Sequence, residues 1–227
     1  MLLRHGQSQW NLENRFTGWT DVPLTGQGRQ EARQAARLLL EAGLSFDSAY
    51  TSLLQRANET LQIVLAELSL ESIPVVRLWQ LNERHYGALQ GQNKAETARQ
   101  LGEPLVMSWR RSYALRPPAL DQDDPRHPRF DPLYAGLSAE ELPATESLQD
   151  TERRLLPCWR QVILPAILSG QRILLVAHSN SLRALVRCLD HIPEQEVPAL
   201  NIPTGIPLVY EMDLSRQPVR RYSLRPS

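Results

Sequence analysis

The chain has 227 residues, with 25 lysines and arginines balanced by 25 aspartates and glutamates, and 42% of its residues are hydrophobic. That length is ample to bury a core, and we expect residues 1–227 to form a single domain. A formal net charge of zero offers no overall positive field to attract nucleic acid, and no apolar run approaches the roughly 20 residues that a membrane helix needs.

The first predicted element is a short strand at the amino terminus, Leu2-Leu3, which ends abruptly at His5. Small and polar residues suited to a turn follow it. A helix is then predicted to run from Gly26 to about Ala42. Thr25 is a preferred N-cap residue, and Gly43 provides a fitting C-terminal stop.

The second strand is predicted over Phe46–Thr51. Ser52 follows it and, with Gln55 three residues further on, is expected to form a capping box for a second helix. A third strand is predicted over Val75–Leu78, where apolar residues follow one another in a short run.

The segment from about Ser112 to Ala144 has a different composition. It contains repeated prolines with acidic residues between them, and it lacks a sustained helix or strand period. A long ordered insertion in a compact domain tends to be functional, so we expect residues 112–144 to contribute to the function.

Helical character resumes from Glu146 to Leu168, where Pro157 and Pro165 are expected to bend or divide the helix. The apolar run Ile173–Ala177 then predicts an inner strand that ends at His178.

The last predicted elements are a helix, Ser181–Leu189, and a terminal hairpin. The hairpin strands are Leu208–Met212 and Val219–Leu224, on either side of the turn residues Ser215–Pro218. Strands that alternate with helices favour an α/β fold. We predict a three-layer sandwich with a mostly parallel central sheet flanked by helices.

The start of the chain and the cysteines are typical of a cytoplasmic protein. Arg4 and the polar residues after it leave no room for a signal peptide. Cys158 and Cys188 are expected to be reduced, buried thiols. Because the sequence has no His-Glu-x-x-His pattern, no cysteine cluster and no grouped aspartates of the kind that bind magnesium with phosphates, we expect no metal cofactor.

Two predicted strands end at a histidine, and open α/β sheets bind ligands at the carboxyl ends of their strands. We therefore expect His5 and His178 to form one site. A lone histidine is more often structural, but Arg4 offers a planar fork of donors for phosphate, and Gly6 allows close backbone approach. His5 is predicted to attack phosphorus as a neutral nucleophile, while Arg4 stabilises the transferring phosphoryl group.

Arg4-His5-Gly6 resembles the signature of the histidine phosphatase superfamily. The likeness to one family within it, the cofactor-dependent phosphoglycerate mutases, continues along nearly the whole chain. The blocks that carry it are Trp10-Asn11, Glu13–Trp19, Tyr50-Thr51-Ser52 with Arg56, Leu81–Gly91, Asn93–Thr97, Trp109–Arg111, Leu142-Pro143, Thr145–Leu148 and Asn201–Gly205.

The resemblance implies an isomerase of glycolysis and gluconeogenesis that interconverts 3-phosphoglycerate and 2-phosphoglycerate. It implies a phosphohistidine at His5, primed by 2,3-bisphosphoglycerate as the cofactor. The catalytic residues that it implies are His5 as carrier, Glu83 as general acid and base, and Arg4, Arg56 and His178 around the phosphate. The substrate-binding residues that it implies are Ser8, Asn11, Thr17, Gly18, Tyr86, Lys94, Arg110, Arg111 and Asn180.

The family likeness also carries expectations about partners and closure. The ligands would be small phosphorylated three-carbon acids, with no nucleic acid or membrane, and the protein would be a homo-oligomer, either a dimer or a tetramer. Segment 112–144 would roof the active site. Relatives usually continue past the terminal hairpin with a mobile tail, whereas here only residues 225–227 follow Leu224. Less complete exclusion of water is therefore expected.

Some residues depart from the family pattern or read differently alone. The second motif usually has glycine where this chain has Ser179, and a positive φ there would cost about 1 kcal/mol. Taken singly, Glu83, Lys94 and Arg110-Arg111 would be ordinary surface charges. We interpret four further residues as structural, solvated or capping: Arg84, His85, His127 and His191.

Three other functions stay open. They are a bisphosphoglycerate mutase, a plain phosphomonoesterase and a silent relative that binds phosphorylated partners. Ser8 and the run Thr17-Gly18-Trp19 favour the glycolytic mutase over the first, and segment 112–144 disfavours the second. The intact charged residues of the motifs disfavour the third.

Overall fold

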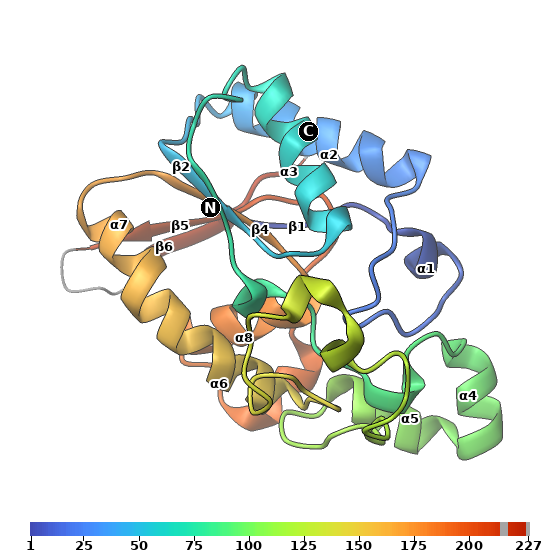
Figure 1. The fold of residues 1–227 in the computed structure, drawn as a ribbon. Helices are drawn as coiled ribbons and strands as arrows, with labels where there is room; N and C mark the ends of the chain where they lie inside the picture. The colour runs from blue at the N-terminus through green and yellow to red at the C-terminus, as the bar shows by residue number, and fades with distance from the viewer. Residues whose placement is uncertain (214–217, 226–227) are drawn as a thin grey trace.

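In a computed structural model of the protein, residues 1–213 and 218–225 are described. The strands of these residues form one mixed sheet of six, in the order β3-β2-β4-β1-β5-β6 (Figure 1). The first four strands of that order run parallel to one another. Strand β5 is antiparallel to β1, and β6 is antiparallel to β5. The strand bounds are β1 Leu2–Arg4, β2 Ser48–Thr51, β3 Val75–Arg77, β4 Ile173–Ala177, β5 Leu208–Met212 and β6 Pro218–Ser223.

Helices cover both faces of the sheet, which confirms the predicted α/β sandwich (Figure 1). On one face lie α2 (Gly26–Glu41) and α3 (Gln55–Glu67). On the other lie α6, α7 and α8, with bounds Leu148–Cys158, Leu164–Leu168 and Ser179–Leu189.

Strand β4 is apolar throughout because both of its faces are buried. Successive side chains of a strand point to opposite faces. Leu174 and Val176 pack on the α2–α3 side, whereas Ile173, Leu175 and Ala177 pack on the α6–α8 side. This two-sided burial is why a parallel inner strand reads as a continuous apolar run.

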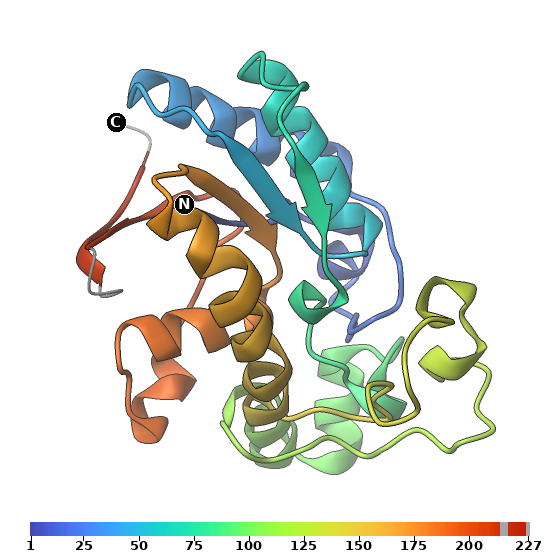
Figure 2. The same cartoon turned by 60° about the vertical axis from the view of Figure 1, so that its left-hand side comes forward.

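Three smaller helices are α1 (Gln9–Leu12), α4 (Lys94–Leu101) and α5 (Glu103–Arg111), and a six-residue 3-10 helix lies at Glu194–Ala199. Helices α4 and α5 and segment 112–144 lie together beyond the carboxyl ends of the parallel strands (Figures 1 and 2). No helix within the described ranges is long and apolar enough to cross a membrane.

The predicted start of α2 is confirmed, and that of α3 is wrong. The Thr25 hydroxyl accepts a hydrogen bond from the Gly28 N–H at 3.0 Å, as an N-cap does. Helix α3 begins instead at Gln55, whose N–H donates to the distant Asp21 carboxylate at 2.7 Å. The Ser52 hydroxyl does not cap this helix: its oxygen accepts from the Leu54 N–H at 3.1 Å, ahead of the first helical residue, and lies 2.8 Å from His178 Nε2.

The predicted division of the helix after Glu146 is confirmed. Ser147 caps α6 in a capping box with Asp150, and a wider π-type turn, Trp159–Ile163, separates α6 from α7. The turn lies between Pro157 and Pro165, which lack the N–H groups that a regular ladder needs. Beyond α8, β5 and β6 pair as the predicted hairpin, and the predicted turn residues 215–217 lie outside the described residues.

Segment 112–144 is anchored to the loop that follows β3. The Ala88 N–H donates to the Pro118 carbonyl at 2.9 Å, and the Arg126 guanidinium donates to the Gln90 carbonyl at 2.9 Å. His127 is buried and caps a short 3-10 turn by accepting from the Arg129 N–H. Its predicted capping role is confirmed, and its predicted solvation is wrong.

Gly6 allows the loop after β1 to touch α2. A Cβ on Gly6 would lie 2.1 Å from the Gly28 carbonyl oxygen, which belongs to the backbone and cannot rotate away. We expect Gly6→Ala to lower the free energy of unfolding by about 1–3 kcal/mol, the usual cost of overpacking. Urea unfolding measures this, with Gly26→Ala as the matched control because no atom lies near its added Cβ. Equal stabilities of the two variants would contradict the proposed contact.

Candidate active site

The sheet register brings the two predicted histidines together. Arg4 pairs with Ala177 across the parallel strands β1 and β4, and the His5 N–H donates to the Ala177 carbonyl at 3.0 Å. The next residue of each strand is therefore a neighbour of the other. The rings of His5 and His178 lie edge to face with centroids 4.9 Å apart.

Hydrogen bonding fixes which nitrogen of His5 is free. Its Nδ1 lies 2.6 Å from the Gly6 carbonyl oxygen, which can only accept. Nδ1 therefore carries the proton, and the lone pair is on Nε2. Nε2 makes no hydrogen bond with the described residues. The ring is thus oriented as a nucleophile requires.

The surroundings keep both histidines neutral. Burial, together with the nearby Arg56 guanidinium, holds the pKa of His5 well below its usual range. The same causes, in the same order, lower the pKa of His178. A neutral imidazole at His5 is therefore the stable form across the neutral pH range.

His178 presents a buried donor that has no partner. Its Nε2 lies 2.8 Å from the Ser52 hydroxyl oxygen, which already accepts from the Leu54 N–H. We assign the Ser52 O–H as the donor to Nε2, which places the proton of His178 on Nδ1. Nδ1 is buried and without a partner among the described residues. An acceptor from a ligand would satisfy it.

A cavity of about 210 Å³ is lined by Arg4 and Ser179, the chain neighbours of the two histidines, although neither histidine is among its described lining residues. Five cationic side chains line it, and Glu83 is the only acidic residue among its described lining residues. The cations are Arg4, Lys94, Arg110, Arg111 and Arg183. Such a lining attracts ligands with more than one negative charge.

Glu83 is held by one of its two carboxylate oxygens. Oε1 accepts from the backbone N–H groups of Arg84, at 2.8 Å, and Asn180, at 3.0 Å. No hydrogen bond to Oε2 is formed within the described residues. Glu83 is 8% exposed and lines the cavity. The geometry leaves one oxygen to exchange a proton with a ligand.

Most of the predicted site residues meet at this cavity. Besides the cations and Glu83, those that line it are Asn11, Thr17, Gly18, Tyr86 and Asn180. Lys94 is largely buried, and this burial lowers its pKa. Burial raises the pKa of Tyr86, but the Arg84 guanidinium over its ring outweighs burial, so the pKa lies below its usual value.

Four of the predicted site residues, His5, Ser8, Arg56 and His178, are not among the described residues that line the cavity. The Ser8 hydroxyl caps α1 by accepting from the Asn11 N–H at 3.3 Å, so it orients a lining residue. The Arg56 guanidinium donates to the carbonyls of Gly18, at 2.8 Å, and Thr20, at 3.0 Å. It therefore holds the loop that lines the cavity, while its charge acts on His5.

Sequence reasoning left three lining residues, Ser179, Arg183 and Asn201, out of the predicted site. Arg183 donates to the Asn180 side-chain oxygen at 2.8 Å, and so fixes the amide that donates to the Tyr86 hydroxyl. A signal existed: Arg183 follows Ser179 by four residues in a helix, which puts both on one face. Asn201 lies in an irregular segment, and no periodic signal identifies it.

Several other expectations are settled by the coordinates. Ser179 lines the cavity without a positive φ, so the predicted strain does not arise. Gly18 does have a positive φ, of 56°. Arg84 and His85 are buried outside the cavity lining, in keeping with structural roles. Gly6 makes close contact with the Gly28 backbone.

The chemistry that this arrangement supports is transfer of a phosphoryl group. A neutral nucleophile, a proton carrier and several cations converge, and buried donors at His178 Nδ1, Arg4 Nε and Arg183 Nε have no partner among the described residues. Within residues 1–213 and 218–225, no group of acidic, histidine or cysteine side chains is arranged to hold a metal ion.

Comparison with known sequences gives full-length matches. The model of the histidine phosphatase superfamily (branch 1) matches residues 1–130 and 120–224. A 2,3-bisphosphoglycerate-dependent phosphoglycerate mutase of Nitrosococcus oceani is 57% identical over 227 residues, which are 100% of this chain and 95% of that protein.

Solved structures match the fold at lower identity. A mycobacterial glucosyl-3-phosphoglycerate phosphatase in complex with VO3 has a TM-score of 0.73 and 23% identity, over 100% of this chain and 98% of that one. A putative alpha-ribazole-5'-P phosphatase from Escherichia coli has a TM-score of 0.69 and 21% identity, over 99% and 94%. These likenesses concern the fold alone.

Proposed function

The chain belongs to branch 1 of the histidine phosphatase superfamily, and we propose that it is an isomerase that interconverts 3-phosphoglycerate and 2-phosphoglycerate. The observation that carries this proposal is the cavity: five cations and one carboxylate are among its described lining residues, and one of these cations is Arg4, which precedes the neutral His5. A phosphorylated three-carbon acid has two anionic groups, and a site for it needs more positive charge than one phosphate requires.

In the proposed reaction, the free hydroxyl of a bound phosphoglycerate attacks phospho-His5. The N–P bond breaks as the new P–O bond forms, and Glu83 takes the hydroxyl proton. After the bound bisphosphate has reoriented, His5 Nε2 attacks the other phosphorus, so that the N–P bond forms again as that ester P–O bond breaks, and Glu83 gives its proton to the departing oxygen. Arg4, Arg56 and the Nδ1–H of His178 stabilise the charge on the transferring group.

The remaining predicted residues are proposed to hold the substrate. Tyr86, Lys94, Arg110, Arg111 and Asn180 would bind the carboxylate and the second phosphate. We propose that Asn11, Thr17 and Gly18 keep the substrate beside His5, and that Ser8 acts through Asn11. Fixed placement of this kind converts binding into a large rate advantage.

The cofactor 2,3-bisphosphoglycerate fits the same residues, because its two phosphates and carboxylate match the excess of cations and the unpartnered buried donors. When bound, it supplies the phosphoryl group that primes His5. The name of the Nitrosococcus oceani relative supports this dependence.

The biological setting is part of the proposal. The reaction belongs to glycolysis and gluconeogenesis, and we propose a cytoplasmic, homo-oligomeric enzyme, either a dimer or a tetramer. We further propose that residues 1–227 act as one domain in which segment 112–144 closes over the site. In the described structure this segment contacts the loop that carries Gln90 but does not line the cavity.

A coupled assay of 3-phosphoglycerate conversion, with and without added 2,3-bisphosphoglycerate, tests the function. We expect conversion that rises steeply when the cofactor is added. Release of inorganic phosphate without formation of 2-phosphoglycerate would instead identify a phosphomonoesterase, and the absence of both reactions would leave only a binding role.

The pH dependence of stability follows from four buried histidines. Burial lowers the pKa of His5, His85, His127 and His178, to about 3 for His85. In the unfolded chain these groups titrate near pH 6.5. Below that pH the unfolded chain binds protons that the folded chain does not, so the free energy of unfolding decreases as the pH is lowered. Above pH 6.5 it does not depend on these groups.

Each of these histidines contributes a slope of up to about 1.4 kcal/mol per pH unit. We expect urea unfolding at about pH 7.5, 6 and 5 to show this loss. A free energy of unfolding that stays constant from about pH 7.5 to about pH 5 would mean that the histidines are protonated in the folded protein.

A further inference from the structure

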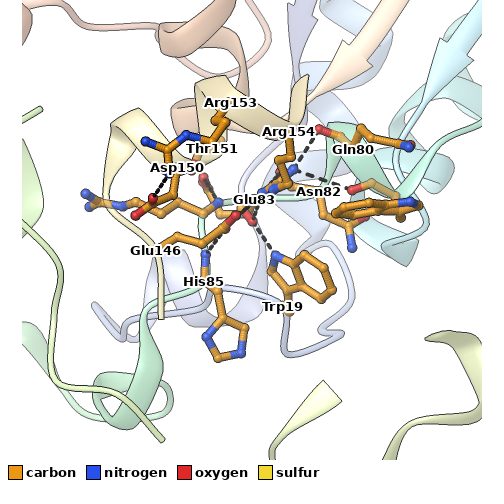
Figure 3. Close-up of polar contacts among 12 residues, drawn as sticks. Trp19, Gln80, Asn82, Glu83, His85, Glu146, Asp150, Thr151, Arg153 and Arg154 are labelled. Atoms are coloured by element: carbon orange, nitrogen blue, oxygen red, sulfur yellow. Dashed lines mark hydrogen bonds and ion pairs between the residues drawn. The ribbon is translucent and has the colours of Figure 1, made fainter. Parts of the chain in front are cut away.

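The side chain of Arg154 lies against the segment that carries Glu83 and forms hydrogen bonds with it (Figure 3). Arg154 comes from α6, and its side chain is 9% exposed. It does not line the cavity. Its guanidinium donates to carbonyls of the loop after β3, namely those of Gln80 at 2.6 Å, Asn82 at 3.0 Å and Glu83 at 2.9 Å.

Glu146 balances the charge of Arg154, and both side chains form hydrogen bonds with the backbone of the segment that carries Glu83. The guanidinium binds the two Glu146 oxygens at 2.6 and 3.0 Å. Oε2 of Glu146 also accepts from the His85 N–H at 2.8 Å. A buried ion pair is often no more stabilising than apolar residues of the same size, so stability alone does not account for this one. The hydrogen bonds of this pair indicate that it holds the segment that carries Glu83 in place.

Trp19 completes the hold on Glu83. The indole N–H donates to the Glu83 carbonyl at 2.6 Å, so this carbonyl accepts from both Trp19 and Arg154 (Figure 3). A carbonyl oxygen has two lone pairs, and both are used. The backbone of Glu83 is thus fixed through its carbonyl oxygen, while its carboxylate is fixed through Oε1 by two N–H groups.

We propose that Arg154 is a positioning residue for proton transfer: it fixes the backbone of Glu83 so that Oε2 faces the reacting hydroxyl. This inference rests on the proposed function, in which Glu83 moves the proton. A guanidinium can reach three carbonyls and a carboxylate at once because its five donors are fixed in a plane. The ammonium of lysine has the same charge but cannot reproduce that fan of donors.

The first test is Arg154→Lys, which keeps a positive charge beside Glu146. We expect kcat to fall by about 10- to 100-fold, because displacement of a reacting group by about 1 Å has effects of that size. KM should stay within about threefold, since the cations of the cavity are untouched. Trp19→Phe removes one donor to the Glu83 carbonyl and keeps a ring, so it should lower kcat by a smaller factor.

Arg187→Lys is the matched control. Arg187 also binds a partly buried carboxylate, that of Glu152, with both contacts at 3.0 Å. It makes no described hydrogen bond with the loop that carries Glu83. Its kcat should equal that of the unaltered protein. Circular dichroism and thermal unfolding establish that each variant is folded.

A double-mutant cycle separates positioning from general stability. If Arg154 acts through Glu83, adding Arg154→Lys to Glu83→Gln leaves the residual kcat within about threefold, because glutamine moves no proton. An equal fold-loss in both backgrounds, or a rise in KM without a fall in kcat, would overturn the proposal.

Conversion of 3-phosphoglycerate by the unaltered protein is measured first. Its absence would refute the proposed function by itself, and the cycle would then be read on hydrolysis of a phosphomonoester. Normal conversion together with additive losses would refute the positioning role alone.

Discussion

Replacement of His5 by alanine is expected to abolish both phosphorylation of the protein and interconversion of the phosphoglycerates. No other described side chain combines a neutral imidazole, a free Nε2 and a place beside the cationic cavity. His178 is adjacent, but its Nε2 is bound to Ser52 and its Nδ1 is assigned as a donor. Removal of the nucleophile therefore leaves no group to carry the phosphoryl.

The measurement is labelling with 2,3-bisphosphoglycerate that carries radioactive phosphorus, followed by exposure to acid. Phosphohistidine is acid-labile, so the label of the unaltered protein should be lost in acid and retained in base. His127→Ala serves as the control, because His127 is a buried histidine whose Nδ1 accepts from the Arg129 N–H in segment 112–144, and its loss should leave labelling intact. Interconversion that persists in His5→Ala would refute the mechanism.

Glu83→Gln is expected to lower kcat by about 10² to 10⁴, the usual range for general acid–base catalysis. Glutamine can still accept the two N–H groups that hold Oε1, so the fold and the binding of substrate should be kept. Because transfer to and from His5 is one reversible step, phosphorylation of His5 should slow by a similar factor.

Prolonged incubation of Glu83→Gln with 2,3-bisphosphoglycerate should still reach the full extent of labelling. The variant therefore separates rate from extent: a slow approach to the same endpoint is expected. Normal turnover would assign the proton transfer to another group, and a failure to label at any time would mean that Glu83 is needed to bind the cofactor.

The central part of the fold could be predicted because it depends on short-range patterns. The apolar run that ends at His178 and the N-cap at Thr25 both describe residues whose partners are local or whose burial is two-sided. The pairing of His5 with His178 needed one further rule, that parallel strands end at the same edge of a sheet.

What could not be predicted depends on contacts between distant segments. Ser52 lies in a sequence pattern typical of a helix cap, but its hydroxyl forms a hydrogen bond with His178, which is 126 residues away. Gly6 is adjacent to the candidate nucleophile, but its missing side chain makes room for the Gly28 backbone. Arg154 lies on an ordinary charged helix in the sequence, and only the fold brings it behind Glu83.

The place of β1 in the sheet has a consequence for synthesis on the ribosome. The first strand to emerge pairs with β4 and β5, which begin 171 and 206 residues after its own start (173 − 2 and 208 − 2). Its hydrogen-bonding edges stay without their native partners until most of the chain has been translated, and such edges favour aggregation. A nascent chain that is released before β4 has emerged lacks the strand that brings His178 next to His5. We therefore expect phosphoryl transfer to develop late in vectorial folding, and demand for chaperone protection to be greatest while Leu2–Arg4 waits for its partners.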